Sequence, residues 1–356
     1  MSTKKMLVLF GLLVISAVLF TACAGPAGEP GPAGPAGPAG PAGPAGPAGE
    51  SATTADLTCT ECHNDTALIS SKKANWQESL HGQGVAFIEE GGNKSCAGCH
   101  SGAAFSAMIA AGQNFATIES GDANPTHQDC RTCHQIHVTY TSADWALETN
   151  APVTTVTSKA TFDGGSGNLC ANCHQARRYM ANFASKDSAG VVIPDKFTPT
   201  ARFNTHYSVQ VDTLMATVDV NAALGVDGKP GAHYSMVENT CVGCHMGEAD
   251  NHRFLPEVGA CVACHADAES IDINGAVTAF EEKVAQLHDA LVAKGLMNDD
   301  GSNVLKDAAG NPVQLDPPQA AALFTYHLIE EDGSNSVHNP NYFNALVDAA
   351  LAALAE

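Results

Sequence analysis

The sequence has few aromatic residues, few charged residues and a shortage of basic side chains. Aromatic residues make up 6 % of the 356 residues and charged residues 15 %, and 38 acidic residues outnumber 17 basic ones, for a formal net charge of -21. Such an acidic surface repels nucleic acid and favours solubility or basic partners. Phosphate-binding loops, dinucleotide fingerprints and Ser/His/Asp arrangements are also missing. The sequence therefore predicts no nucleic-acid partner and carries no signature of nucleotide-dependent or serine-hydrolase chemistry.

Cysteine is absent outside one recurring pattern, with a single exception at Cys23. The pattern is Cys-x-x-Cys-His, and its six copies are Cys59, Cys62 and His63; Cys96, Cys99 and His100; Cys130, Cys133 and His134; Cys170, Cys173 and His174; Cys241, Cys244 and His245; and Cys261, Cys264 and His265. In one helical turn the two sulfurs and the imidazole lie on one side, where they can reach the same porphyrin. Zinc sites do not need a histidine after every second cysteine, a thioredoxin-like motif would occur once, and a disulfide framework would leave the histidines unexplained. The pattern therefore predicts six covalently bound c-type haems.

The N-terminal apolar run is too short to serve as a membrane span. It covers the fifteen residues Met6–Phe20, after two lysines and before Thr21-Ala22-Cys23, whereas a span takes about 20 residues. A basic start, an apolar segment of secretory length and small residues before a cleavage point indicate an exported protein. The segment resembles a bacterial lipoprotein signal, which implies that residues 1–22 are removed, that Cys23 is lipidated and that the protein is anchored to the outer membrane.

Glycine recurs at every third position from Gly25 to Gly49, mostly as Gly-Pro-Ala. This collagen-like pattern fixes a polyproline II backbone without internal hydrogen bonds. A single strand would extend about 3.1 Å per residue and form a semi-rigid stalk of about 75 Å, whereas three strands could join the protein into a homotrimer. Residues 23–50 are therefore predicted to be a lipidation site followed by a stalk, and the trimer stays open as an alternative.

The rest of the chain is predicted to comprise a hexahaem-binding domain, residues 51–266, and a C-terminal helical region, residues 267–356. Because aromatic side chains are few, we expect haem macrocycles to form the core. Gly- and Asn-rich intervals between the motifs indicate short helices and loops wrapped around stacked haems, with little strand apart from residues 151–161. We expect residues 212–230, in the longest interval, to be an insertion at one side. The predicted fold class is mainly α with extensive coil.

Three helices are predicted in the C-terminal region. Apolar residues recur at spacings of three and four over residues 277–291 and stop before Gly295, which is typical of an amphipathic helix with its stop signal. A second helix is predicted near residues 318–331, and a third from Pro340 to the end of the chain. We expect these helices to pack on the haems.

Histidine is abundant beyond the motifs. Six of the fifteen histidines complete the motifs as proximal ligands, and the other nine are His81, His127, His137, His206, His233, His252, His288, His327 and His338. Six of these could fill the second axial position of every haem iron. Bis-histidine ligation would make the haems low-spin electron carriers.

Several segments resemble the superfamily of pentahaem cytochrome c nitrite reductase and the octahaem hydroxylamine oxidoreductases. They are Ser79-Leu80-His81-Gly82, Cys170 to Arg177, His233 ahead of Cys241 to Met246, Asn251-His252-Arg253-Phe254 ahead of Cys261, and Val337-His338-Asn339-Pro340. The resemblance implies four distal ligands, which are His81 on the Cys170 haem, His233 on the Cys261 haem, His252 on the Cys130 haem and His338 on the Cys241 haem.

The distal position of the Cys96 haem is left open by the resemblance. His206 falls where the nitrite reductases have an active-site histidine, so it could cap the Cys96 haem or stand beside an open iron and handle protons. The reductases attach their reactive haem through a motif that ends in lysine, whereas the matching motif here ends in His100. This difference favours electron transfer over catalysis.

The Cys59 haem lies outside the resemblance. Either His127 or His137, which flank the Cys130 motif, could be its distal ligand. His288 and His327 belong to the predicted C-terminal helices, where we expect them to be packed or surface side chains.

Together these features predict a hexahaem c-type cytochrome that passes electrons between a membrane-side donor and an external or periplasmic acceptor. Two alternatives stay open. One is a nitrite- or hydroxylamine-type oxidoreductase with a single open haem, and the other is an oligomeric, conductive cytochrome assembly.

Overall fold

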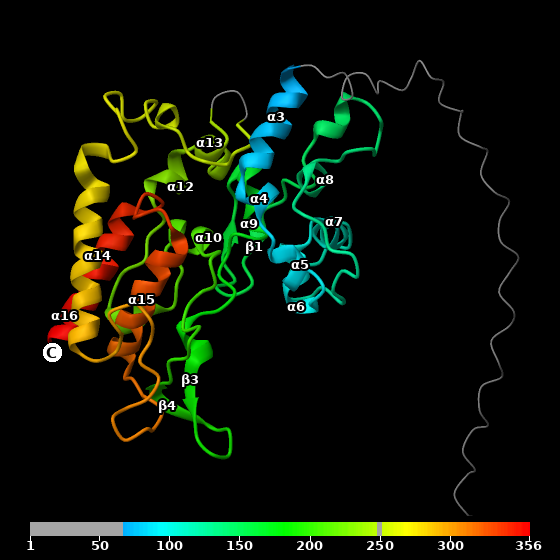
Figure 1. The fold of residues 1–356 in the computed structure, drawn as a ribbon. Coiled ribbons are helices and arrows are strands. Elements are labelled where there is room, and N and C mark those ends of the chain that lie inside the picture. Colours follow the sequence, from blue (N-terminus) through cyan, green and yellow to red (C-terminus); the bar gives the residue numbers. More distant parts are fainter. Residues whose placement is uncertain (1–66, 248–250) are drawn as a thin grey trace, which may run out of the picture. The chain divides into compact units, whose positions relative to one another are not determined.

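The computed structural model describes residues 67–247 and 251–356, all within one unit, Ala52–Glu356. The predicted signal peptide, Cys23 and the stalk lie outside the described residues, as do Cys59, Cys62 and His63 of the first motif. The structure consists mainly of helices joined by long coil segments (Figure 1), with two small two-stranded sheets. The prediction of a mainly α fold with extensive coil is therefore confirmed.

Short helices make up the part of the fold that carries the motifs. The first of them are α3 (Ala67–Glu78), α4 (Leu80–Gln83), α5 (Ala86–Glu90), α6 (Lys94–His100), α7 (Gly102–Ala110) and α8 (Cys130–Cys133). The next are α9 (Asn168–Ala171), α10 (Gln210–Leu214), α11 (Val220–Leu224), α12 (Ala232–Met236) and α13 (Cys241–His245). Single turns of 3-10 helix, η1 to η5, lie at Ser142–Trp145, Gly165–Gly167, Met180–Phe183, Val258–Ala260 and Ile273–Gly275.

Both sheets are antiparallel hairpins. In the first, β1 (Val153–Thr154) pairs with β2 (Thr161–Phe162), so the stretch predicted as a strand at 151–161 is a hairpin in which Thr155 and Ala160 begin the turn. In the second, β3 (Ala184–Lys186) pairs with β4 (Val192–Phe197). The carboxylate of Asp187 accepts hydrogen bonds from two backbone amides of the connecting turn. This second hairpin was not predicted.

The three predicted C-terminal helices are confirmed. They are α14 (Ala276–Ala293), α15 (Pro317–Asp332) and α16 (Pro340–Ala355), which pack against one another (Figure 1). Asp316 caps α15 by accepting a hydrogen bond from the backbone of Gln319, and a proline follows each N-cap of α15 and α16, as is favourable at a helix start.

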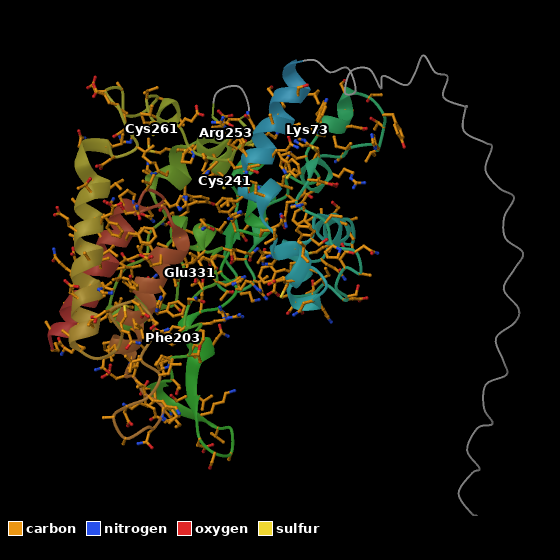
Figure 2. The ribbon with its side chains drawn as sticks, in the orientation of Figure 1. Lys73, Phe203, Cys241, Arg253, Cys261 and Glu331 are labelled. Carbon is orange, nitrogen blue, oxygen red and sulfur yellow. The ribbon has the colours of Figure 1, made fainter. Side chains whose placement is uncertain are left out.

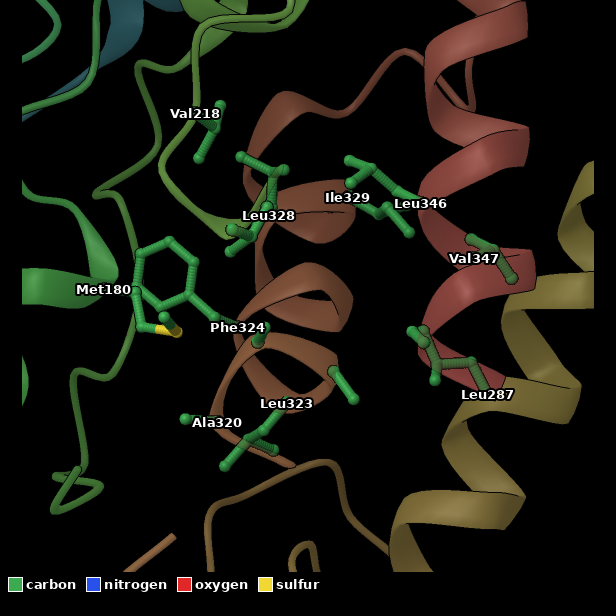
Figure 3. Close-up of a cluster of buried hydrophobic side chains, with 14 of the residues drawn as sticks. Met180, Val218, Leu287, Ala320, Leu323, Phe324, Leu328, Ile329, Leu346 and Val347 are labelled. Atoms are coloured by element: carbon green, nitrogen blue, oxygen red, sulfur yellow. The ribbon is translucent and has the colours of Figure 1, made fainter. Parts of the chain in front are cut away.

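A conventional hydrophobic core holds these helices together (Figure 3). Its fully buried members include Leu287, Leu323, Phe324, Leu346 and Val347. The expectation that the haem macrocycles form the core is therefore wrong for this part of the chain. Most members of this core are aliphatic, so the low percentage of aromatic residues could not reveal it.

The expectation that residues 212–230 form an insertion at one side is also wrong. Val218 and Val220 belong to the same core, and α11 packs on α15 and α16. The carboxylate of Asp212 is fully buried and accepts hydrogen bonds from the backbone of Ala176 and the hydroxyl of Tyr179. These residues join the C-terminal helices to the chain that follows the Cys170 motif.

A second apolar cluster lies among the motifs. Buried side chains of α6 and α7, with Phe115, Ile118 and Leu169, pack against Cys99, Cys133 and Cys173. Cysteines from three motifs thus meet around one small core. None of the helices in the described part of the chain is both long and apolar enough to cross a membrane.

Candidate haem-binding site

Helical turns bring the two cysteines and the histidine of each described motif together. α6 ends with the Cys96 motif, α8 and α9 carry the first turns of the Cys130 and Cys170 motifs, and α13 is the Cys241 motif. In the Cys261 motif, which follows the 3-10 turn η4, the amides of Cys264 and His265 both donate to the Cys261 carbonyl, over 3.1 and 2.8 Å. Since residues about one turn apart share a helix face, each motif presents its two sulfurs and its imidazole together.

Each of these five motif histidines faces a histidine from elsewhere in the chain. The ring centroids are 6.1 Å apart for His100 and His206, 6.3 Å for His134 and His252, 6.3 Å for His174 and His81, 6.2 Å for His245 and His338, and 6.4 Å for His265 and His233. The narrow range of the separations indicates a common cause.

Two imidazoles on opposite faces of one metal ion would give this separation. An imidazole nitrogen binds a metal at about 2.0 Å and its ring centre lies roughly 1.2 Å beyond, so two coaxial ligands would place their ring centres about 6.4 Å apart. The residues present therefore fit a c-type haem at each pair, with two cysteines of the same motif nearby to bind the porphyrin edge.

Hydrogen bonds to Nδ1 orient several of these imidazoles. His134 Nδ1 donates to the carbonyl of Trp145 over 2.7 Å, and His245 Nδ1 to that of Phe254 over 2.9 Å. Because a carbonyl can only accept, Nδ1 carries the proton and Nε2 of the neutral ring is left free to bind a metal.

Three further rings are held in the same way. His233 donates from Nδ1 to the carbonyl of Val337, His174 to Oε1 of Gln210 over 3.1 Å, and His338 to the carboxylate of Asp332 over 2.9 Å. Five of the ten paired histidines thus have a defined Nδ1 acceptor. The sequence carries no signal for these acceptors, because a backbone carbonyl has no residue signature and Gln210 and Asp332 belong to no motif.

Thiol contacts show that the motifs are neighbours. The thiol of Cys173 donates to the carbonyl of Gly98, inside the Cys96 motif, and the thiol of Cys241 donates to the carbonyl of Gly167, three residues before Cys170, each over 3.9 Å. The Cys170 motif therefore lies beside the Cys96 and Cys241 motifs. Burial, followed by the charge of nearby Cys170, raises the pKa of Cys133 to about 12.

The Cys261 motif continues this series of contacts. Cys244 lies close to both Cys261 and Cys264, and burial is the main cause of its raised pKa. Cys264 and Cys130 are exposed, whereas the other eight described motif cysteines are partly buried. Figure 2 places Cys241 and Cys261 on neighbouring segments. The five described motifs therefore form one connected group.

Phe254 lies where three histidine pairs meet. Its ring contacts His81 at 4.9 Å and His252 at 5.9 Å between centroids, while its carbonyl accepts from His245. The adjoining Arg253 forms an ion pair with Glu78 at the end of α3, at 2.9 Å. This pair links the His252 segment to α3, next to helix α4, which carries His81.

Two arginines flank the His100–His206 pair. Arg177 donates to the carbonyl of Ser95 over 2.7 Å, directly before Cys96, and Arg178 donates to Asn204 over 2.7 Å, two residues before His206. Burial first, and then these arginines, lower the pKa of His206 to about 4. The imidazole of His206 is therefore neutral at pH 7, as a metal ligand must be.

His127 and His137 lie near the Cys130 motif, but the motif they were predicted to complete, with Cys59 and Cys62, is outside the described residues. His127 packs against Phe87 with centroids 4.1 Å apart, and its Nδ1 is buried without a hydrogen-bond partner among the described residues. His137 stacks on Tyr140 with centroids 5.5 Å apart. Haem attachment at Cys59 and Cys62 and the choice between these two histidines both stay predictions.

The two histidines expected to be packed or on the surface make contacts of that kind. His327 Nε2 hydrogen-bonds Oδ1 of Asn303 over 2.8 Å, and burial lowers its pKa to about 4. His288 lies beside Tyr326 and the exposed carboxylate of Asp289. Neither ring has a second histidine opposite it among the described ring contacts.

No protein-family model and no curated protein matches the chain. The solved structures similar to it are cytochromes. One is the outer cell wall cytochrome OcwA, with 19 % sequence identity and a TM-score of 0.48 over 80 % of this chain and 50 % of that one. Another is the undecaheme cytochrome from the S-layer of Carboxydothermus ferrireducens, with 18 % identity and a TM-score of 0.45 over 78 % of this chain and 40 % of that one. The chain spans half or less of the length of these proteins, and its function is inferred from its own residues.

Proposed function

We propose that this protein is a multihaem c-type cytochrome that transfers electrons. The observation that carries the proposal is the set of five histidine pairs with ring centroids 6.1 to 6.4 Å apart, each pair beside two cysteines of a Cys-x-x-Cys-His motif. A packed core has no reason to repeat this spacing five times with one member of every pair drawn from such a motif.

Six haems are assigned to named residues. The pairs would be His100 with His206, His134 with His252, His174 with His81, His245 with His338 and His265 with His233, each with the cysteines of its motif, and His63 with His127 or His137 beside Cys59 and Cys62. When bound, haem supplies reversible one-electron oxidation and reduction at iron. Imidazoles on both faces leave no free coordination position, which favours electron transfer over catalysis.

The oxidoreductase alternative would require an open iron, and the Cys96 motif is its strongest location. Arg177, Arg178 and Arg202 surround His206 and could attract an anionic substrate. The ring centres of His100 and His206 are 6.1 Å apart, close to the separation expected for two imidazoles bound to the same iron. This separation argues against an open iron. Electron transfer is therefore the preferred function.

Location and partners follow from the N-terminal sequence. We propose that the lipid anchor at Cys23 and the Gly-Pro-Ala segment hold the haem-binding part away from the outer membrane, between a membrane-side donor and an external or periplasmic acceptor. The acidic composition favours basic surfaces on these partners. A homotrimer formed by the collagen-like segment stays an alternative to the single-stranded stalk.

The test is the haem content and spin state of the purified mature protein. The expected results are a polypeptide mass increased by six covalent haems and a ferric spectrum in which every haem is low-spin. A high-spin signal that shifts on adding nitrite would favour the oxidoreductase. A mass without haem, or cysteines holding zinc, would refute the cytochrome assignment altogether.

A further inference from the structure

One of the paired histidines donates to a carboxylate. Asp332, the last residue of α15, is 5 % exposed, and both its oxygens lie 2.9 Å from Nδ1 of His338. The Nδ1 groups of His134, His233 and His245 donate instead to backbone carbonyls, and that of His174 donates to an amide oxygen. The acceptor at His338 is a carboxylate, which carries a full negative charge when ionised.

The fold holds this charge in place. The Thr213 hydroxyl donates to Oδ2 over 2.5 Å, and the Ser334 backbone and hydroxyl donate to Oδ1. Together with the N–H of His338, four donors therefore converge on the two oxygens of Asp332, and an ionised carboxylate is the form that accepts hydrogen bonds at both oxygens. α10, α15 and the α15–α16 turn fix the direction of this side chain.

A carboxylate that accepts the Nδ1 proton of a ligand makes the imidazole more basic and a stronger donor to the metal. Stronger donation stabilises ferric iron more than ferrous iron, and a buried negative charge acts in the same direction because the ferric site is more positive. A carbonyl or amide oxygen has the same effect to a smaller extent, since it carries only a partial charge.

We propose that Asp332 is a positioning residue that, through His338, lowers the reduction potential of the Cys241 haem. The proposal rests on the proposed function, because it presupposes a haem between His245 and His338. It adds a residue with a defined electrostatic effect that neither the motifs nor the histidine count identifies.

The test compares redox titrations of the full-length haem-loaded protein. Asp332→Asn keeps the size and the oxygen acceptor but removes the charge, so one reduction step should move to more positive potential while the other steps stay in place. The low-spin ferric signal of the same site should shift in the electron paramagnetic resonance spectrum. Asp219→Asn is the matched control, because Asp219 accepts hydrogen bonds from the backbone of Met180 and Ala181 and no histidine bond to it is found among the described residues.

A second variant keeps the test valid if Asp332→Asn loads haem poorly. Thr213→Val removes a hydroxyl that competes with His338 for the carboxylate, so it should move the same step to more negative potential, opposite to Asp332→Asn. The proposal is overturned if variants with full haem content leave every reduction step unmoved, or if Asp219→Asn moves the same step equally. Absence of haem or of low-spin iron in the wild type would instead refute the proposed function itself.

Discussion

At the scale of single residues, the motifs and the count of histidines identified most of the site, while its surroundings stayed hidden. His81, His233, His252 and His338 were named from short local segments, and each lies opposite a motif histidine. What could not be foreseen is what holds these rings. Asp332 acts on His338 through a turn of the chain, and no periodicity or spacing marks such a contact.

The pairing of His81 with His174 can be tested by removing one ring. His81→Ala should leave the Cys170 haem with a single axial imidazole, so one of the haems should become high-spin in the ferric state. Electron paramagnetic resonance of the purified variant measures the change. His288→Gln is the control, because His288 lies beside Asp289 rather than opposite a histidine, and it should leave all haems low-spin. An unchanged spin state in His81→Ala would remove His81 from the ligand set.

A histidine outside the haem pairs should make stability depend on pH. Burial lowers the pKa of His327 to about 4, compared with an ordinary value of 6.5. Between these two values the unfolded chain binds the proton and the folded chain does not, so stability present above pH 6.5 is lost as the pH falls towards 4. The loss is on the order of 1.4 kcal/mol per pH unit.

This dependence is measured by urea unfolding of the haem-loaded protein at pH 7 and pH 5. Other groups also titrate in this range, so the quantity that matters is the difference between the wild type and His327→Gln. The variant is expected to be less stable at pH 7, because Asn303 loses its partner, but to lose less stability on acidification. Equal losses in both proteins would contradict a buried, neutral His327.

At the scale of elements, periodicity predicted the long helices and missed the short ones. Helices α14 to α16 each repeat their apolar side chains over several turns, so their faces are visible in the sequence. α10 and α11 are five residues long and too short to show a period. The β3–β4 hairpin depends on the cap that Asp187 provides and on pairing across the turn. Tertiary contacts, rather than local propensity, determine these elements.

The core of the three long helices should be sensitive to the loss of a single side chain. Leu323 on α15 is fully buried, so Leu323→Ala is expected to lower the free energy of unfolding by about 2–5 kcal/mol through lost burial and an unfilled cavity. Urea unfolding followed by circular dichroism gives the value. Leu305→Ala makes the same chemical change at a side chain that is 40 % exposed and should cost clearly less. Equal costs would mean that this core contributes little to stability.

At the scale of the whole molecule, charge is distributed unevenly in a way that the net value conceals. The chain carries 38 acidic and 17 basic residues, yet Arg177, Arg178 and Arg202 all lie close enough to His206 to lower its pKa. Two carboxylates partly oppose them, Glu90 near His100 and Glu331 near Arg178. Burial raises the pKa of Glu331 to about 7. This side chain is therefore only partly ionised at neutral pH and offsets the charge of the arginines only in part. The surroundings of the Cys96 motif are therefore more positive than the composition implies.

This local positive charge should raise the reduction potential of the Cys96 haem. Removing one charge with Arg178→Gln is expected to shift one reduction step to more negative potential by tens of millivolts, given that about 59 mV corresponds to a tenfold change for one electron. Redox titration of the haem-loaded protein measures the shift. Lys283→Gln is the control, since Lys283 pairs with Asp348 between α14 and α16, and it should leave every step in place. If both variants gave the same shift, or neither gave any, the arginines would have no specific effect on this haem, and its potential would depend on burial and its two imidazoles alone.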